Sequence, residues 1–539
     1  MVVGENTSKR AVCFFLCLTA LDFLAGCHTA ADEIERFQMN LDDKDTTTLK
    51  QSVALVAAPR GWSEPLLAEQ GVPFDLKLKN LTPSPLELLG FTGNDWNPMA
   101  RVFDAEGTLL HNISSQMASE HLLGHRGEPT RPAKLFMLKP EGEGSTWMNL
   151  AKYAGALPPG KYTFQAAHRL LPLDPTEIYS EKLPFEVVQA QVFHAALGYE
   201  SSLHEQTLLA WIAAPEGGAP RVMVRWSGAS HNVSYWGGNV YGETEPDAHV
   251  AVSELPADTD GDGQGWVAVL AGRSLELIRH NMSYPTWRSG AIELPIEGGI
   301  PISPFPERGG CLFLATGTVD GKSVLAGVVQ QPGDENQTVW TVPLAGQPEL
   351  SACAFGPTGA ISLLFASRDQ QQTHLSRMDV DESGAVLSPQ QVVRTTDHEV
   401  HAVAVDSRRG LPLAFVFLEA DREKLDHLAL MRLPVDGEVG GPDPERQRGW
   451  PVIEENEKEV VLRAEKLCLE VGRDGGSVIG LIDEKGDFYG GRLGHSLERF
   501  AEAPAKKIDH LHIATFKGGH DVAGFTAEGY LFNTGGHAH

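Results

Sequence analysis

The chain has few basic residues for its length and few cysteines, and each shortage excludes a class of protein. Lys and Arg number 44 against 71 Asp and Glu in 539 residues, which gives a formal net charge of −27. A surface that follows nucleic-acid phosphates needs clustered positive charge, so this balance argues against a nucleic-acid partner. Six cysteines in so long a chain are too few for the disulfide framework of small secreted domains.

Sequence motifs of the common enzyme classes are also missing. The chain contains no phosphate-binding P-loop, no dinucleotide-binding glycine fingerprint and no G-x-S-x-G nucleophile turn. His398-Glu399-Val400-His401 resembles a zinc-protease motif only superficially, because the second His comes one residue early and lies in a predicted strand. None of these enzyme classes is therefore indicated by a motif.

The composition is that of a folded protein with more than one domain. Hydrophobic residues make up 42% and charged residues 21% of the chain, which suits buried cores and not extended disorder. The length is several times that of a typical domain of about 100 to 150 residues. At least two folded units are therefore expected.

The N-terminal segment has the pattern of a secretory signal. Lys9-Arg10 precedes a mostly apolar stretch, residues 11–26, which is short for a membrane span. It ends in Leu24-Ala25-Gly26-Cys27, which resembles the lipobox of bacterial lipoproteins, although Asp22 departs from the apolar pattern. The resemblance implies that residues 1–26 are removed and that Cys27 becomes a lipid-modified N-terminus anchored in a membrane. The alternatives are an ordinary signal peptide and a short tail anchor, each with Cys27 unmodified.

The residues after Cys27 bear on location and spacing. In the family, an Asp directly after the cysteine tends to retain the lipoprotein in the inner membrane. Here that position is His28, so the resemblance favours the outer membrane of a bacterial cell envelope. Residues 27–50 are rich in Asp and Glu and poor in large apolar side chains, which predicts a solvated acidic tether.

Residues 51–189 show the pattern of a small β-sandwich. Phe74, Leu76 and Leu78 alternate with polar residues, as in a strand with one buried face. The segment Leu157-Pro158-Pro159-Gly160-Lys161-Tyr162 resembles the entry to a late strand of immunoglobulin-like domains. The resemblance implies an immunoglobulin-like fold and no activity.

Residues 190–539 contain an internal repeat of roughly 50 residues, the period of four-stranded propeller blades. Each repeat begins with a short apolar strand, continues through a turn with Gly and returns in a second apolar strand. The repeat starts are His194, His249, Pro301, Ser351, His401, Leu467 and His512. The sequence therefore predicts an all-β chain whose second domain is a seven-bladed β-propeller; six or eight blades, or tandem β-sandwiches, are the alternatives. We expect the last blade to borrow a strand from residues 185–191.

Histidine occupies four of these repeat starts: His194, His249, His401 and His512. If they converge in a central channel, neutral imidazoles could bind zinc or another transition metal. The alternative is that each imidazole hydrogen-bonds backbone between neighbouring blades.

A second candidate metal site is an acidic loop. Asp258, Asp260 and Asp262 occupy alternate positions with glycines between them, and the loop resembles the calcium loops of integrin-type propellers. Trp266 and Val269 stand where further ligands are usual, so a plain acidic turn is the alternative.

These expectations lead to one leading function and one alternative. The leading function is an exported, lipid-anchored binding or scaffolding protein that recognises an unknown protein or glycan through its loops. The alternative is a metal-assisted hydrolase or lyase whose site lies at the mouth of the propeller channel.

Overall fold

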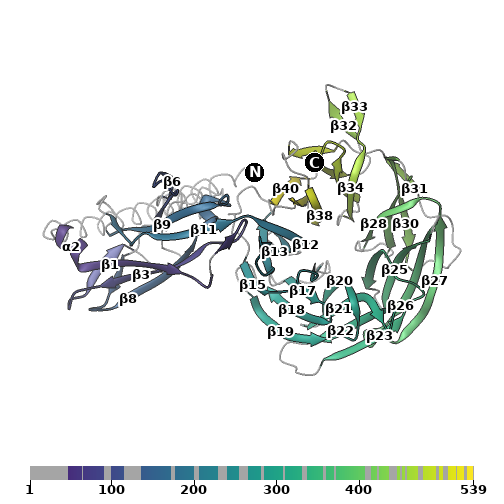
Figure 1. Ribbon diagram of the computed structural model, residues 1–539, viewed down its shortest axis with the longest axis horizontal. Helices are drawn as coiled ribbons and strands as arrows, with labels where there is room; N and C mark the ends of the chain where they lie inside the picture. The colour runs from purple at the N-terminus through teal and green to yellow at the C-terminus, as the bar shows by residue number, and fades with distance from the viewer. Residues whose placement is uncertain are drawn as a thin grey trace, which may run out of the picture. The chain divides into compact units, whose positions relative to one another are not determined.

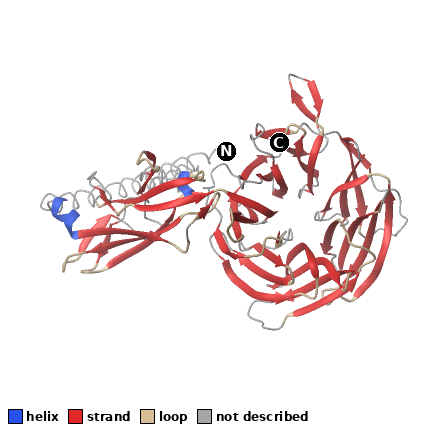
Figure 2. Cartoon of the chain, in the orientation of Figure 1, coloured by secondary structure: helices blue, strands red, loops and turns tan. Residues whose placement is uncertain are grey.

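The computed structural model describes most of the chain from residue 46 onward. The described ranges are 46–62, 65–89, 99–113, 135–170, 177–199, 206–228, 239–253, 265–280, 285–307, 310–330, 337–355, 360–369, 372–406, 414–421, 424–435, 446–449, 452–455, 458–471, 477–492, 497–501, 508–516, 519–526 and 531–537. Strands dominate these ranges, as Figure 2 shows, and none of their helices is long and apolar enough to cross a bilayer.

The chain divides into two compact units. The N-terminal unit comprises Met1–Gly61, Pro73–Met148 and Lys161–Phe185, and the C-terminal unit comprises Trp62–Val72, Asn149–Gly160 and Glu186–His539. Two short segments of the N-terminal sequence therefore belong to the C-terminal unit.

The N-terminal region is built from two main sheets, in which all described pairs are antiparallel except the parallel pair of β2 and β11. One sheet has the order β1-β3-β8 and the other β2-β11-β9-β5-β6, with β10 paired to β9; β4 and β7 form a separate pair. The elements are α2 (Thr46–Ser52), β1 (Val53–Pro59), β2 (Leu66–Leu67), β3 (Pro73–Asn80), β4 (Leu86–Leu89), β5 (Met99–Phe103), β6 (Leu109–Ile113), β7 (Leu135–Leu138), β8 (Glu143–Asn149), α4 (Ala151–Ala154), β9 (Gly160–Arg169), β10 (Glu177–Tyr179) and β11 (Leu183–Val188). Phe74 of β3 stacks on Phe164 of β9 at 3.8 Å between ring centroids, which joins the two sheets through a buried aromatic core.

The C-terminal unit consists mainly of consecutive four-stranded meanders, shown from teal to yellow in Figure 1. Among the described residues six sheets have four strands, the last has three, and a hairpin stands between the fifth and sixth. The strands are β12 (Ala190–Tyr199), β13 (Gln206–Pro215), β14 (Arg221–Gly228) and β15 (Asn239–Glu243); β16 (His249–Val252), β17 (Gly265–Ala271), β18 (Ser274–His280) and β19 (Pro285–Glu293); β20 (Glu297–Glu307), β21 (Gly310–Val319), β22 (Lys322–Gln330) and β23 (Thr338–Pro343); β24 (Leu350–Phe355), β25 (Ile361–Arg368), β26 (Thr373–Val380) and β27 (Val386–Thr396); β28 (Glu399–Asp406), β29 (Ala414–Asp421), β30 (Lys424–Pro434) and β31 (Arg446–Gly449); the hairpin β32 (Val452–Glu455) and β33 (Lys458–Val461); β34 (Ala464–Val471), β35 (Ser477–Asp483), β36 (Phe488–Arg492) and β37 (Glu498–Ala501); and β38 (Ile508–Phe516), β39 (Gly519–Thr526) and β40 (Leu531–His537). The expected all-β, propeller-like organisation is confirmed.

The first strands of the sheets contact one another in a closed order. β12 contacts β16, and the series continues through β20, β24, β28, β34 and β38, which contacts β12 again. The expected strand exchange at this closure is wrong. β11, which spans Leu183–Val188, pairs with β2 and β9, while Ala190 already begins β12, so the last described sheet gains no strand from residues 185–191. The segment instead belongs to β11 and β12.

The core of this unit lies in layers between successive sheets. One layer packs Leu277 and Ile292 of the second sheet against Phe313 and Val328 of the third. Further layers join the first and second, third and fourth, fourth and fifth, and fifth and sixth sheets. Strands buried on both faces explain the near-continuous apolar runs of the second strands.

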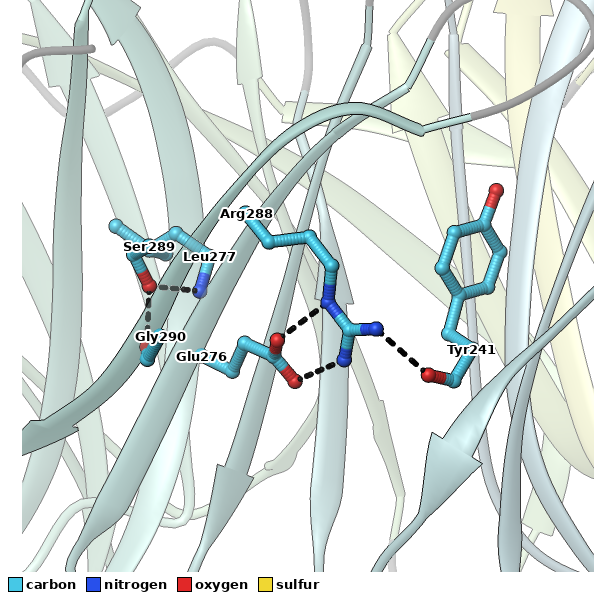
Figure 3. A network of polar contacts seen from close by, with 6 residues as sticks. All are labelled: Tyr241, Glu276, Leu277, Arg288, Ser289 and Gly290. Carbon is cyan, nitrogen blue, oxygen red and sulfur yellow. Dashed lines mark hydrogen bonds and ion pairs between the residues drawn. The ribbon is translucent and has the colours of Figure 1, made fainter. Parts of the chain in front are cut away.

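A polar contact joins the outer strands of the first two sheets (Figure 3). Arg288 of β19 donates from Nε and Nη2 to the two carboxylate oxygens of Glu276, at 2.6 and 2.9 Å, and from Nη1 to the carbonyl of Tyr241 on β15, at 2.9 Å. Beside it, the β18–β19 register skips Leu277, whose amide donates to Ser289 Oγ at 3.0 Å. The hydroxyl thus satisfies a backbone group that the ladder leaves out.

Three hairpins use the same Asp-x-x-Gly turn, beginning at Asp104, Asp381 and Asp483. In each, the carboxylate oxygen accepts a backbone N–H four residues later, at 2.6, 2.9 and 2.8 Å. The glycine at the fourth position has a φ of 82°, 81° or 82°, in the left-handed region that favours glycine. The local sequence therefore determines the turn.

Two of these glycines give a matched test of packing against backbone strain. A Cβ at Gly384 would lie 2.5 Å from the Trp340 ring, whereas a Cβ at Gly486 would meet nothing within 4 Å. We expect Gly486→Ala to cost about 1 kcal/mol from the backbone alone. Gly384→Ala should cost a further 1–3 kcal/mol or so, because Trp340 must move. Urea denaturation of both variants measures the difference, and equal losses would contradict the packing argument.

Candidate functional site

The fourth and fifth sheets bring a group of polar side chains to one end of the C-terminal unit. In an antiparallel meander, the loop after the second strand and the loop after the fourth strand leave the sheet at the same end. Here those loops are residues 369–372, between β25 and β26, and residues 397–398, between β27 and β28. We call the side chains at this end the rim cluster: Arg368, Asp369, Gln372, His374, Thr395, Asp397 and Glu399.

Short polar contacts hold the rim cluster together across the two sheets. Arg368 Nη1 lies 3.0 Å from Glu399 Oε1, and Gln372 Nε2 donates to Asp397 Oδ1 at 2.9 Å. His374 places Nε2 2.9 Å from Asp369 Oδ2 and Nδ1 3.1 Å from Thr395 Oγ1. All of these groups are partly exposed, so each can exchange its present partner for a ligand.

The contact of Asp369, His374 and Thr395 has the order carboxylate, imidazole, hydroxyl. When the carboxylate accepts a hydrogen bond from Nε2–H of the neutral ring, Nδ1 is left to accept a hydrogen bond from the hydroxyl. Hydrolases use that order to activate a nucleophile. Thr395, however, lies exposed on an outermost strand, where water would remain in contact with any reacting group. The arrangement therefore suits polar recognition better than acyl transfer.

His401 lies beside this cluster at an irregularity in the innermost strand. In β28, Val400 and Ala402 each pair with a residue of β29, but His401 between them has no partner in the register. His401 therefore forms a bulge in the ladder. Burial lowers the pKa of His401, the charge of Glu399 opposes that shift, and Arg368 adds to it. Its Nε2 is buried without a hydrogen-bond partner among the described residues. Burial thus favours the neutral form of this ring, and one of its nitrogens makes no hydrogen bond to the described residues.

His194 and His249 come together where the first strands of the first two sheets meet. Their ring centroids are 4.6 Å apart with the rings nearly perpendicular, and the Val250 amide donates to His194 Nδ1 at 3.3 Å. That bond makes His194 a bridge between sheets, as one of the two sequence interpretations expects. Burial lowers the pKa of His249, partly offset by Asp247, and its Nδ1 has no partner within the described ranges.

The structure does not place the four repeat-start histidines at one equivalent position. The ladder skips Phe193 in β12, His401 in β28 and Asp509 in β38. Counted from these bulges, His194 follows the bulge directly, His401 is the bulge itself and His512 comes three residues after it. A one-residue bulge shifts every later side chain, so His194, His401 and His512 occupy different positions in the ladders of their strands.

The structure describes the remaining predicted site residues only in part. His512 lies on β38, whose backbone is described and whose side chain at this position is not. Cys27 and the acidic loop residues Asp258, Asp260 and Asp262 lie outside the described residues. Within the described residues, no three His, Cys, Asp or Glu side chains are grouped so that they could hold a metal ion. Cys311, Cys353 and Cys468 are thiols and form no disulfide with one another.

Sequence reasoning missed Arg368, Asp369 and His374. The Asp369-x-x-Gln372 turn is a local signal that places its flanking residues at a sheet end, since Asp369 Oδ1 accepts the Gln372 amide at 2.8 Å. The contacts of Arg368 with Glu399 and of Gln372 with Asp397 join separate segments, so they have no fixed spacing along the chain.

The buried histidines predict a stability that falls in acid. The folded state lowers the pKa of His249 and His401 below the ordinary value of 6.5. The unfolded chain therefore binds protons first, and stability is lost as the pH falls from about 6.5 toward the folded values. We expect His249→Gln with His401→Gln to flatten the decline of melting temperature between pH 7 and 5 by on the order of a few degrees. An unchanged slope in the double variant would contradict this assignment.

No family model and no curated protein matches the chain. The similar solved structures include a glucose dehydrogenase, 14% identical, covering 53% of this chain and 96% of that chain with a TM-score of 0.33. A lectin from Aleuria aurantia in complex with alpha-methyl-L-fucoside is 11% identical over 58% of this chain and 95% of that chain, with a TM-score of 0.32. The β-propeller domain of the Trilobed protease from Pyrococcus furiosus is 11% identical, covers 64% and 95% respectively, and has a TM-score of 0.35.

Proposed function

We propose that this protein is an exported, lipid-anchored binding or scaffolding protein. In this proposal residues 51–189 form an immunoglobulin-like domain and residues 190–539 form a seven-bladed β-propeller, which together present loops on rigid sheets. Cys27 carries the lipid, residues 27–50 act as the tether, and the protein resides in the bacterial cell envelope, at the outer membrane. The lipobox-like residues 24–27 and the acidic stretch after them support the address.

The rim cluster carries the binding proposal. It gathers guanidinium, carboxylate, amide, imidazole and hydroxyl groups from two neighbouring sheets at one end of the unit. Neighbouring hydrogen-bond donors and acceptors can recognise hydroxyl-rich or peptide ligands. Because these groups lie at the ends of sheets, no long loop has to become ordered when a ligand binds. The ligand is an unidentified protein or glycan.

Arrays of glycans and peptides probed with the full chain test this role. Asp369→Asn combined with Arg368→Met should abolish or strongly weaken the signal of the array members that bind. Asp320→Asn is the matched control, because Asp320 lies exposed in the turn at the same end of the third sheet and its φ of 50° suits Asn. Identical binding by the rim variant and the natural chain would overturn the assignment.

Fatty-acid incorporation tests the proposed lipid anchoring independently. Cells that express the full chain should transfer a labelled fatty acid to it and retain it in the membrane fraction. Cys27→Ser should release the protein and remove the label. Label that persists in Cys27→Ser would refute lipidation at this residue.

A metal-assisted hydrolase or lyase is the second candidate, favoured by the closeness of His194 and His249. Two imidazoles are too few for a transition-metal site, so this candidate needs further ligands, among which His512 is the first to test. Calcium at Asp258, Asp260 and Asp262 is a separate proposal. Metal content of the purified chain, measured before and after His194→Ala with His249→Ala, decides the first. A melting temperature that does not change with calcium or chelator would refute the second.

A further inference from the structure

The outer face of one sheet in the N-terminal unit gathers cationic and aromatic side chains. Val102 of β5 and Phe164 of β9 point into the core, so their strand neighbours point outward. We call this the cationic face and define it by the residues that share it: Arg101, Phe103, Lys161, Gln165, Arg169, Tyr179 and Lys182.

Arg101 is held in a fixed orientation at the centre of this face. Its guanidinium carbon lies 4.4 Å from the centroid of the Tyr179 ring, and Nη2 donates to the Tyr179 hydroxyl at 2.7 Å. That hydroxyl donates in turn to Glu177 Oε2 at 2.6 Å. Arg101 itself is 3.7 Å from the same carboxylate, beyond hydrogen-bond distance. The side chain is 35% exposed, so its remaining N–H groups can reach a ligand.

Arg169 supplies a second guanidinium next to the first. It lies on β9 opposite Glu177 of β10, and its closest approach to that carboxylate is 3.9 Å. Its Nε is buried and has no hydrogen-bond partner among the described residues. The Arg169 side chain is 33% exposed, so its outer N–H groups can reach an anionic oxygen, the natural partner of a guanidinium.

A second cation–aromatic pair lies further along the same strand. Lys182 Nζ is 4.3 Å from the centroid of the Phe103 ring. Phe103 and Arg101 are two residues apart on β5 and therefore about 6.6 Å apart on one face. Gln165, directly opposite Arg101 on β9, adds an amide whose Nε2 donates to the Ser180 carbonyl at 3.0 Å and whose oxygen can accept from a ligand. The face thus carries two cation–aromatic pairs, Arg101 with Tyr179 and Lys182 with Phe103. The neutral amide of Gln165 lies beside them.

We propose that the cationic face binds an acidic polysaccharide, a chain of sugars that carry carboxylates. Arg101, Arg169, Lys161 and Lys182 gather there around Glu177, in a protein whose net charge is −27. A guanidinium fork matches a carboxylate, and amide and aromatic groups match sugar hydroxyls and ring C–H faces. An extended polymer can follow the flat outer face of a sheet. The site lies outside the rim cluster and does not depend on it.

Calorimetric titration of the full chain with polygalacturonate tests the proposal. We expect polygalacturonate to bind and dextran, a neutral polymer, not to bind. Arg101→Met should weaken the Kd about tenfold, the loss expected for one charge-assisted contact. Glu177→Gln should tighten it several-fold, because the competing carboxylate is removed while its hydrogen bond to Tyr179 can remain.

The control is Lys77→Met, which removes the same charge from the other sheet. Lys77 is exposed on β3 and pairs with Glu143 at 3.1 Å. It should leave the Kd unchanged. If Arg101→Met fails to fold, Lys182→Met and Glu177→Gln still require shifts in opposite directions. Failure of polygalacturonate to bind, equal losses in Lys77→Met and Arg101→Met, or binding only to phosphatidylglycerol vesicles would each overturn the proposal.

Discussion

Arg394→Met should destabilise the C-terminal unit by about 3–5 kcal/mol, because it leaves a buried carboxylate without its partner. Arg394 on β27 donates from Nε and Nη2 to Glu419 on β29 of the next sheet, at 2.9 and 3.3 Å. The Glu419 side chain is only 1% exposed. Water cannot replace the lost guanidinium there. Chemical denaturation followed by tryptophan fluorescence measures the loss.

The neighbouring pair Arg368 and Glu399 gives the matched control at the same junction. Both of its side chains are about one-third exposed, so Arg368→Met should cost no more than about 1 kcal/mol. Arg394→Met combined with Glu419→Leu should recover much of the stability lost in the single variant, since neither charge then remains buried. A single variant as stable as the natural chain would mean that Glu419 is solvated or protonated without Arg394.

Leu67→Ala should cost about 2–5 kcal/mol, although Leu67 lies more than a hundred residues before the sheet that it stabilises. It belongs to β2, and its side chain is buried against Trp211 and Met223 of the first sheet. Arg221 donates to the Pro65 carbonyl at 2.9 Å, and Glu69 lies 3.8 Å from Arg225. The segment Trp62–Val72 is therefore structurally part of the C-terminal unit. Thermal unfolding of the full-length variant provides the measurement.

The control for this prediction is Leu81→Ala. Leu81 is 58% exposed, so the same truncation there should change stability by less than about 0.5 kcal/mol. A chain that lacks the first 185 residues should be weakened more than Leu67→Ala, because it loses Glu69 as well as Leu67. Equal melting temperatures for Leu67→Ala and Leu81→Ala would show that the segment does not support the sheet.

The strand pattern of the C-terminal unit could be predicted from sequence because it depends on local signals. Each predicted repeat start falls within the first strand of a sheet, from His194 in β12 to His512 in β38. Apolar alternation and glycine turns are visible within about ten residues. The same signals predicted the alternation of Phe74, Leu76 and Leu78, all of which are buried.

The candidate site was less predictable because its contacts cross between sheets. A bulge inserts one extra residue into a strand, and residues of any type can occupy it, as Phe193, Ile302 and Glu465 show. The insertion changes which side chain faces which neighbour. The rim cluster depends on how two loops meet. The insertion of Trp62–Val72 into the other unit has no periodicity at all. The local sequence pattern therefore predicted the strands but not the positions of the side chains of the candidate site.

The three-stranded last sheet makes one junction of the C-terminal unit different from the others. Between consecutive sheets the chain itself crosses the junction, whereas the contact of β38 with β12 joins strands far apart in sequence. No described strand extends the last sheet across it. Separation there requires side chains to part, and no ladder of backbone hydrogen bonds has to break. Amide hydrogens of β38, β39 and β40 should therefore exchange through a local opening of lower free energy than those of the second to fifth sheets.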